Sequence, residues 1–195
     1  MGLARVLLSK KMLLMGNFVL SSGKMSPYYL DLRKFPSYPE FREVVEKAME
    51  LLKEVKFDSV VGVATGGLPL AGFLACRLNL PMAYVRSERK GHGTDRLLEG
   101  EVEGKEVVIV DDVATTGSSL ERALIEVSKQ GGKVKAAMVI VDRQEGAKSR
   151  IESYGATLLS VSKISDILRE LLESGLLAQQ EEAAVREYLV SNVEA

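Results

Sequence analysis

The sequence contains the same local pattern twice: a short apolar strand, a loop of small or polar residues, and a helix. In the first copy, the strand is expected at residues 59–64 and the helix at residues 68–78. In the second copy, the strand is expected at residues 107–110, the loop at 111–117 and the helix at 118–129. Strands that are apolar on both faces are typical of parallel sheets covered by helices. The pattern therefore predicts an α/β fold with a mostly parallel sheet flanked by helices.

Other segments extend this sheet and its helical cover. Apolar residues recur at helical spacing between residues 41 and 55, and Ser37 with Glu40 is placed to form a capping box before this helix. The remaining expected elements are strands at residues 82–85, 134–141 and 157–161 and helices at 164–172 and 178–190.

A small hood is expected beside the sheet. Short strands at residues 18–21 and 28–32 precede the sheet, so residues 1–35 are expected to form most of this hood. The two C-terminal helices are expected to pack against the sheet or against a partner subunit. With 195 residues, of which 46% are hydrophobic, the chain can bury one substantial core, and residues 1–195 are expected to form a single domain.

Charge and cysteine content restrict the partners and the compartment. The formal net charge is −1, so no overall field attracts the protein to nucleic acid or to an anionic membrane. The single cysteine, Cys76, cannot form an internal disulfide, and no apolar stretch approaches the span of a bilayer. We expect a cytoplasmic protein that binds neither nucleic acid nor a membrane.

The loop after the second strand carries the strongest chemical signal. Asp111 and Asp112 end an apolar strand and are followed by small and hydroxyl-bearing residues. Backbone N–H groups at a helix start, together with hydroxyls and the helix dipole, suit a phosphate dianion. Paired carboxylates beside that phosphate can accept hydrogen bonds from sugar hydroxyls. The residues assigned to this ribose-phosphate site are Asp111, Asp112, Val113, Ala114, Thr115, Thr116, Gly117, Ser118 and Ser119.

An ordinary turn with acidic capping is the alternative for this loop, but it explains only one aspartate and one serine. The loop lacks the lysine of a Walker motif, and it is not the G-x-G-x-x-G motif of dinucleotide-binding proteins. With its strand, acid pair and Thr-Gly turn, it resembles the signature loop of the phosphoribosyltransferase family. The resemblance implies that Asp111 and Asp112 face the ribose hydroxyls of phosphoribosyl pyrophosphate (PRPP) and that residues 115–119 hold its 5-phosphate.

Three further segments are similar to orotate phosphoribosyltransferases. Residues 18–29 resemble the base-recognition segment of that family, residues 85–93 its mobile catalytic loop, and residues 142–145 the motif after its next strand. The resemblance implies transfer of ribose 5-phosphate from PRPP to orotate, which gives orotidine 5'-monophosphate and pyrophosphate in de novo pyrimidine (UMP) biosynthesis. It also implies a homodimer, because the mobile loop of the family commonly reaches into the neighbouring subunit's site.

The segment that resembles the mobile loop is rich in cations. Arg86, Arg89, Lys90, His92 and Arg96 place five potential cations within eleven residues. Departure of pyrophosphate builds negative charge on its oxygens, so cations that arrive with loop closure would favour the transition state. Lys90 and His92 are the leaving-group candidates, and Arg86 is the third catalytic candidate of this segment. A solvated loop residue is the alternative for His92, the only histidine of the chain.

Arg143 is the candidate for binding the carboxylate of orotate. It follows the strand at residues 134–141, which places its guanidinium near the carboxyl edge of the sheet. A surface arginine paired with Glu145 is the alternative. Tyr28 and Tyr29 point in opposite directions along a strand, so one is expected to reach the base while the other packs. The further candidates for the orotate site are Ser21 and Thr115.

Pyrophosphate and its metal ion have a separate expected site. Thr65, Gly66 and Gly67 offer backbone N–H groups at another helix start, which suits pyrophosphate. Related enzymes often carry lysine at the positions of Gly66, Ser87 and Ser21, so cation contacts here must come from the mobile loop or from Mg²⁺. Mg²⁺ is the expected cofactor, bound chiefly by diphosphate and ribose oxygens and water, and no direct protein ligand is assigned.

Two other functions stay open as alternatives. A purine phosphoribosyltransferase would share the acid-pair loop but would need no carboxylate clamp, so Arg143 and the hood segment favour orotate. A regulator that binds PRPP without catalysis should carry a nucleic-acid-binding segment or a basic face, and the net charge of −1 gives no sign of one.

Overall fold

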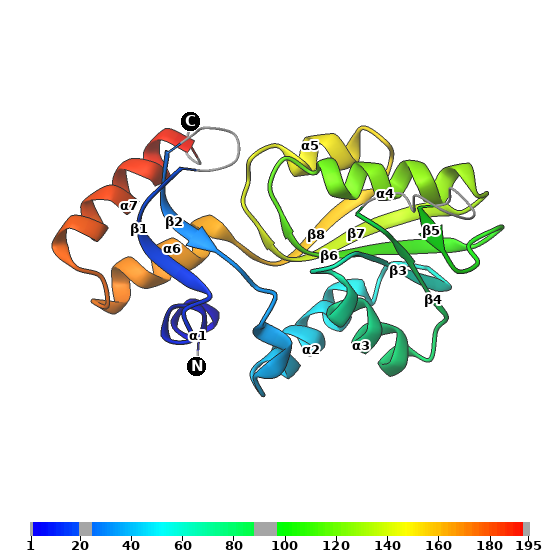
Figure 1. Ribbon diagram of the computed structural model, residues 1–195, viewed down its shortest axis with the longest axis horizontal. Helices are drawn as coiled ribbons and strands as arrows, with labels where there is room; N and C mark the ends of the chain where they lie inside the picture. The colour runs from blue at the N-terminus through cyan, green and yellow to red at the C-terminus, as the bar shows by residue number, and fades with distance from the viewer. Residues whose placement is uncertain (1, 20–24, 88–96, 193–195) are drawn as a thin grey trace.

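The chain forms a six-stranded sheet and a smaller hood in the computed structural model, which describes residues 2–19, 25–87 and 97–192 (Figure 1). The strands of the sheet are β3 (Ser59–Val63), β4 (Met82–Val85), β5 (Leu98–Glu99), β6 (Glu106–Ala114), β7 (Lys133–Asp142) and β8 (Thr157–Lys163). Their spatial order is β5-β4-β3-β6-β7-β8, and only the β4–β5 pair is antiparallel among them. The predicted mostly parallel α/β fold is confirmed.

Helices cover both faces of the sheet because its central strands are apolar on both sides. The helices on one face are α2 (Phe41–Leu52) and α3 (Leu68–Leu78), and those on the other are α4 (Ser118–Lys129) and α5 (Ala147–Glu152) (Figure 1). Val108 of β6 belongs to the core beneath α2 and α3, whereas Ile109 belongs to the core beneath α4 and α5. In the described ranges, no helix is long and apolar enough to cross a membrane.

The hood is built from segments before and after the sheet. Its members are α1 (Leu3–Ser9), β1 (Leu13–Val19), β2 (Met25–Leu30), α6 (Ile164–Ser174) and α7 (Gln179–Asn192). β1 and β2 form an antiparallel ribbon, α6 contacts both α1 and β8, and α7 contacts both α6 and β2 (Figure 1). The C-terminal helix α7 thus packs on the hood, and residues 1–35 form only part of that lobe.

Two predictions at the N-terminal side are wrong, namely the capping box before α2 and the start of the first hood strand. Ser37 does not cap α2: it ends the short 3₁₀ helix η1 (Phe35–Ser37), and its hydroxyl donates to the Lys34 carbonyl at 2.7 Å. The N-cap of α2 is Glu40, whose side chain makes no capping bond. In the hood, β1 begins at Leu13 rather than at residue 18, because a register irregularity between Met15 and Phe18 interrupts the alternation on which the prediction relied.

The acid pair belongs to a strand rather than to a loop. β6 continues to Ala114 because its pairing with β7 continues, with Asp111 opposite Val139 and Ala114 opposite Asp142. The connection to α4 is therefore only residues 115–117, shorter than the predicted loop. A strand holds the carboxylates more rigidly than a loop would, which suits a binding site.

The two cores provide a test of how tightly the central strand is packed. Ile109→Ala, at a position that is 0% exposed, should lower the free energy of unfolding by about 2–5 kcal/mol through lost burial and a residual cavity. Ile125→Ala on α4, where the side chain is 37% exposed, is the matched control and should change it much less. Denaturant unfolding measures both, and similar losses in the two variants would contradict the assigned core.

Candidate active site

The two loops predicted to bind phosphate groups lie side by side at one edge of the sheet. β3 and β6 are adjacent and parallel, with Gly62 opposite Val110, so the segments that follow them leave the sheet together. A Cβ atom on Gly66 would overlap the carboxylate of Asp112, and a Cβ atom on Gly67 would overlap the backbone carbonyl of Val110. Two adjacent glycines therefore allow the first loop to touch the acid pair.

The carboxyl groups of the two aspartates lie close enough together to interact directly, although each borders a different part of the site. Asp111 is 7% exposed and lines a cavity together with the loop that follows, whereas Asp112 lies against Gly66. One oxygen of Asp111 accepts a hydrogen bond from the backbone N–H of Asp112, and one oxygen of Asp112 accepts from that of Val113, each at 2.9 Å. Asp111 thus faces the cavity, and Asp112 faces the first loop.

Burial changes the titration of this pair. Burial, and then the neighbouring Asp112 carboxylate, raise the pKa of Asp111 to about 8. Burial also raises the pKa of Asp112. Hydroxyl groups that donate to the charged carboxylates would lower both pKa values again. The pair is therefore suited to take up a polyhydroxyl ligand with release of a proton.

The cavity beside Asp111 has the features of a phosphate site. It measures about 90 Å³, and residues 113–119, which the sequence assigned to this site, all line it. No side chain caps the start of α4, so the N–H groups of its first turn are available to a ligand. The hydroxyls of Thr116 and Ser118 lie 2.8 Å apart. Gly117 has a φ of +80°, and a Cβ atom there would lie 3.0 Å from the Cα of Ala147. The first residue of α5 therefore packs closely against the turn.

Arg143 lies next to this cavity and is largely buried. Its backbone N–H donates to the carbonyl of Ala114 at 2.8 Å, which joins the ends of β7 and β6. Its Nε donates to the hydroxyl of Tyr28 at 3.1 Å, and its guanidinium carbon lies 5.0 Å from the centre of the Tyr28 ring. Its Nη2 lies 2.8 Å from Oε1 of Glu145, without the alignment of a hydrogen bond. Arg143 is therefore paired with Glu145, as the alternative expected, but its side chain is only 11% exposed and so it is not a surface arginine.

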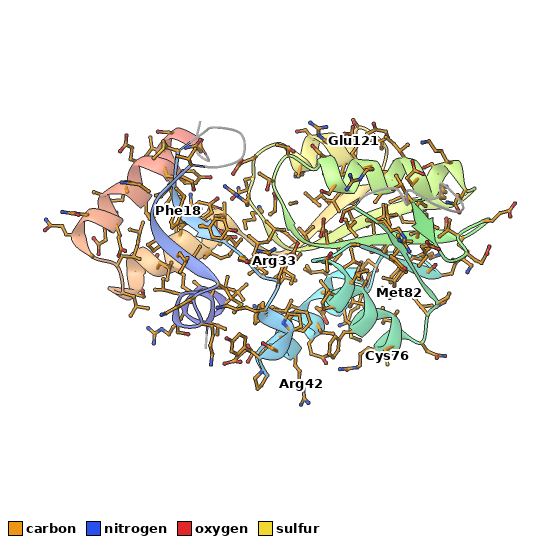
Figure 2. All side chains as sticks on the ribbon, viewed as in Figure 1. Phe18, Arg33, Arg42, Cys76, Met82 and Glu121 are labelled. Carbon is orange, nitrogen blue, oxygen red and sulfur yellow. The ribbon has the colours of Figure 1, made fainter. Side chains whose placement is uncertain are left out.

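The two hood tyrosines have different surroundings. Tyr28 is 0% exposed, and its hydroxyl reaches Arg143 and also lies 3.2 Å from the hydroxyl of Tyr188 on α7. Tyr29 is 43% exposed and packs on the ring of Phe18, which Figure 2 labels in the hood, with ring centres 5.7 Å apart. The sequence did not single out Tyr188, because helical periodicity locates α7 without showing what it contacts.

The first loop and the start of the cationic segment are tied together. Ser87 donates its hydroxyl to the carbonyl of Ala64 at 2.8 Å, directly before Thr65. Arg86 forms an ion pair with Glu99 at 3.0 Å, and its backbone N–H donates to the carbonyl of Leu97 at 2.9 Å. The candidates that lie outside the described residues are Ser21, Arg89, Lys90 and His92.

The described part of the chain offers limited metal-binding groups. Across residues 2–19, 25–87 and 97–192, no group of three or more histidine, cysteine, aspartate or glutamate side chains is close enough to hold a metal ion. The acid pair supplies carboxylate oxygens at the carboxyl end of β6, and the Asp31 carboxylate lies near enough to raise the pKa of Asp112. Such a site fits a hard cation that keeps most of its ligands from water and substrate.

The raised pKa of Asp111 predicts an unusual pH dependence of stability. Between pH of about 4 and about 8, the folded carboxyl keeps its proton whereas the unfolded one, with its ordinary pKa of 3.8, has lost it, so the free energy of unfolding should fall as pH rises. Asp111→Asn should weaken this fall. Urea unfolding at several pH values measures it, with Asp166→Asn, whose side chain is 60% exposed, as the control. Equal slopes for the wild type and Asp111→Asn would contradict the prediction.

A family model, a sequence relative and a solved structure all show that the chain is similar to phosphoribosyltransferases. A family model described as a phosphoribosyl transferase domain matches residues 37–164. The orotate phosphoribosyltransferase of Saccharolobus solfataricus is 56% identical over 194 residues, covering 100% of each chain. The crystal structure of orotate phosphoribosyltransferase from Aeropyrum pernix is 39% identical, with a TM-score of 0.80 over 91% of this chain and 100% of that one.

A fourth comparison concerns a solved complex. The orotate phosphoribosyltransferase of Mycobacterium tuberculosis, in complex with 5-phospho-alpha-D-ribosyl 1-diphosphate, is 27% identical, with a TM-score of 0.65 over 84% of this chain and 95% of that one. The family model covers the acid pair, both loops and Arg143. Since that model spans more than half of the sequence and full-length relatives share about half of its residues, the chain belongs to the phosphoribosyltransferase family, among its orotate phosphoribosyltransferases.

Proposed function

We propose that the protein transfers ribose 5-phosphate from PRPP to orotate, which gives orotidine 5'-monophosphate and pyrophosphate in pyrimidine biosynthesis. One observation carries this proposal: an acid pair, of which Asp111 is buried, and an uncapped helix start lie at one sheet edge, directly beside a glycine loop from the neighbouring strand. These groups match the hydroxyls, the 5-phosphate and the diphosphate of PRPP. The Mycobacterium tuberculosis relative, solved with that ligand, supports the assignment.

Each end of PRPP has its own set of protein groups in this proposal. The N–H groups and hydroxyls of residues 115–119 hold the 5-phosphate, since they line the cavity at the start of α4. Asp111, which lines the same cavity, accepts a hydrogen bond from a ribose hydroxyl. Asp112, which lies against Gly66 of the first loop, accepts a hydrogen bond from the neighbouring ribose hydroxyl. Backbone N–H groups of residues 65–67 bind the diphosphate. Two anionic groups are thereby fixed on either side of the sugar.

The reaction is a displacement at C1 of the ribose. The bond from C1 to the pyrophosphate oxygen breaks with both electrons leaving on oxygen. A ring nitrogen of orotate forms the new bond to C1 and gives up its proton, which is taken up by the departing pyrophosphate or by water. Because negative charge grows on the leaving group, the cations of the mobile loop stabilise the transition state more than the ground state. We assign this role to Arg86, Arg89, Lys90 and His92. Arg86 would exchange its contact with Glu99 for the pyrophosphate.

We also propose Mg²⁺ as the cofactor. The carboxylates of Asp111 and Asp112 are the described groups that would hold it, directly or through water, while the diphosphate supplies most of the ligands. When bound, Mg²⁺ neutralises charge on the diphosphate. The protein groups then need only to orient the sugar and to exclude water from C1.

A homodimer is the proposed assembly, in which each mobile loop serves the neighbouring site. On the side of α3 and β4, Phe73 is 47% exposed and Met82 is 37% exposed, and Figure 2 labels Met82 and Cys76 on this side. These exposed side chains are where a contact with a second copy would be sought first. Sedimentation that gives a single species of 21.3 kDa would contradict this proposal.

A panel of bases tests the function itself. With PRPP and Mg²⁺ supplied, orotate should disappear with release of pyrophosphate, and chelation of Mg²⁺ should stop the reaction. Consumption of a purine base instead would show that the protein is a purine phosphoribosyltransferase, an enzyme whose substrate has no carboxylate to bind. Binding of PRPP without turnover of any base would show a sensor of that metabolite.

Arg143 provides the sharpest test of base recognition. Arg143→Lys keeps the charge but loses the planar fork, and it should raise the KM for orotate by about 10- to 100-fold, as expected for the loss of a hydrogen bond to a charged group. The KM for PRPP should change little. Arg77→Lys is the matched control, because Arg77 pairs with Glu46 on the surface with 51% exposure. An unchanged KM for orotate in Arg143→Lys would exclude Arg143 from the base site.

A further inference from the structure

Three side chains that are far apart in the sequence meet between the hood and the sheet. Tyr28 comes from β2, Arg143 follows β7, and Tyr188 comes from the C-terminal helix α7. The hydroxyls of Tyr28 and Tyr188 lie 3.2 Å apart, and their rings form an edge-to-face pair with centres 5.4 Å apart. Arg143 donates from Nε to the same Tyr28 hydroxyl at 3.1 Å. The C-terminal helix is therefore connected to Arg143 through one buried hydroxyl.

The chemistry of these groups fixes the direction of the hydrogen bonds. Arg143 can only donate, so the Tyr28 oxygen accepts from it. The proton of the Tyr28 hydroxyl then needs an acceptor, because a buried donor without one is costly. The Tyr188 oxygen is the described group within reach. The chain of donors thus runs from Arg143 to Tyr28 and from Tyr28 to Tyr188.

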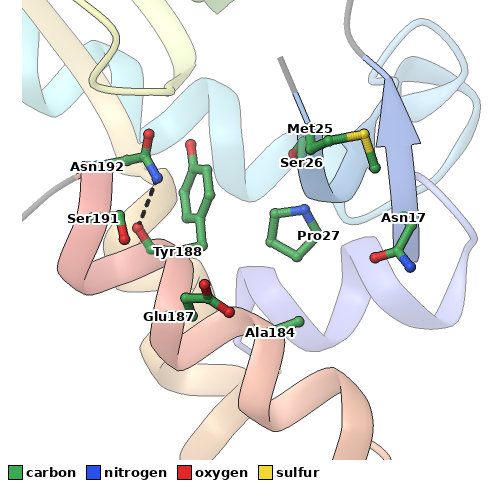
Figure 3. Close-up of a pocket in the computed structure, with 9 residues that line it drawn as sticks. All are labelled: Asn17, Met25, Ser26, Pro27, Ala184, Glu187, Tyr188, Ser191 and Asn192. Carbon is green, nitrogen blue, oxygen red and sulfur yellow. Dashed lines mark hydrogen bonds between the residues drawn. The ribbon is translucent and has the colours of Figure 1, made fainter.

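Tyr188 contacts Tyr28 on one side through its hydroxyl and its ring. On its other side, it borders a pocket of about 240 Å³ between the hood ribbon and α7, with Pro27 and Ala184 among the lining residues (Figure 3). The backbone carbonyl of Tyr188 accepts a hydrogen bond from the side chain of Asn192 at 3.1 Å, which steadies the last turn of α7 (Figure 3). Tyr188 as a whole is 8% exposed and belongs to the hydrophobic core.

The guanidinium of Arg143 is held at one end and unsatisfied at the other. Nε is bound by Tyr28, and the Tyr28 ring lies under the guanidinium carbon. Nη2 is buried beside Glu145 but lacks an aligned acceptor. Its N–H groups can donate to a planar carboxylate, which would take the place of Glu145 beside Nη2.

We propose that Tyr188 is a positioning residue for the orotate site, which acts through the Tyr28 hydroxyl to hold the Arg143 guanidinium in the orientation that meets the carboxylate of the base. The inference rests on the role of Arg143 in the proposed function. It assigns to the C-terminal helix a part in choosing the base, without contact between that helix and the substrate.

Steady-state kinetics of the full-length enzyme test this inference. Tyr188→Phe removes one hydroxyl and keeps the ring pair, so the KM for orotate should rise about 2- to 10-fold, as expected for the loss of one neutral hydrogen bond, while kcat and the KM for PRPP stay near wild type. Tyr28→Phe removes both bonds and should raise the KM for orotate further. Tyr38→Phe, next to α2, is the matched control and should leave all three constants unchanged.

A double-mutant cycle separates positioning from a structural role. In an Arg143→Ala background, Tyr188→Phe should have no further effect on the KM for orotate, because the group on which it acts is gone. Equal effects of Tyr188→Phe in both backgrounds would overturn the inference, as would an unchanged KM for orotate in Tyr188→Phe when Arg143→Ala alone raises it. A lower kcat together with reduced thermal stability would indicate a purely structural role and would also overturn it.

The same data distinguish this inference from the proposed function. If the wild-type enzyme does not consume orotate, the proposed function is wrong. If it does but Arg143→Ala leaves the KM for orotate unchanged, the assignment of the base site is wrong and the role of Tyr188 falls with it. If only the Tyr188→Phe and Tyr28→Phe results fail, the function and the base site stand without this inference.

Discussion

The parallel pairing of β3 with β6 is the contact on which the site depends. It brings the glycine loop after one strand to the acid pair of the other, so that groups separated by more than forty residues lie within van der Waals contact. The pairing of β6 with β7 then adds Arg143, whose backbone bonds to the end of β6. Three consecutive strands of the sheet thus supply the phosphate, sugar and base contacts of the proposed site.

The burial of Asp111 lowers the stability of the fold when its carboxylate is charged, but it favours the binding of a sugar hydroxyl. The fold places Asp111 in a nearly closed position, where its charged form is unfavourable. The same position gives a sugar hydroxyl a rigid acceptor with little competition from water. Binding and stability are therefore coupled, since a ligand that donates to the pair relieves the cost of its charge.

The periodicity of the sequence predicted five of the six strands of the sheet, because its central strands are apolar on both faces and alternate with helices. It missed β5 (Leu98–Glu99), which is too short to show an alternation. The cavity that the proposed function assigns to the ribose phosphate was also predictable as a grouping of residues, since residues 113–119 adjoin one another along the chain and all line it. Contacts between segments that are distant in the sequence could not be predicted. Nothing local marks Tyr188 as a neighbour of Tyr28, and α5, with six residues, is too short to show helical periodicity. The end of β6 was misplaced because two aspartates are typical of loops, whereas pairing with β7 keeps them in a strand.

The hood has a consequence for the order in which the molecule is made. Its ribbon precedes the sheet, while α6 and α7 follow it, so the N-terminal ribbon emerges from the ribosome long before the helix that covers it. The sheet with its cavity at the start of α4 can fold during synthesis, but the hydrogen bond between Tyr28 and Tyr188 cannot form until α7 has been translated. The contact between Tyr28 and Tyr188 can therefore form only after both the ribbon and α7 have been synthesised.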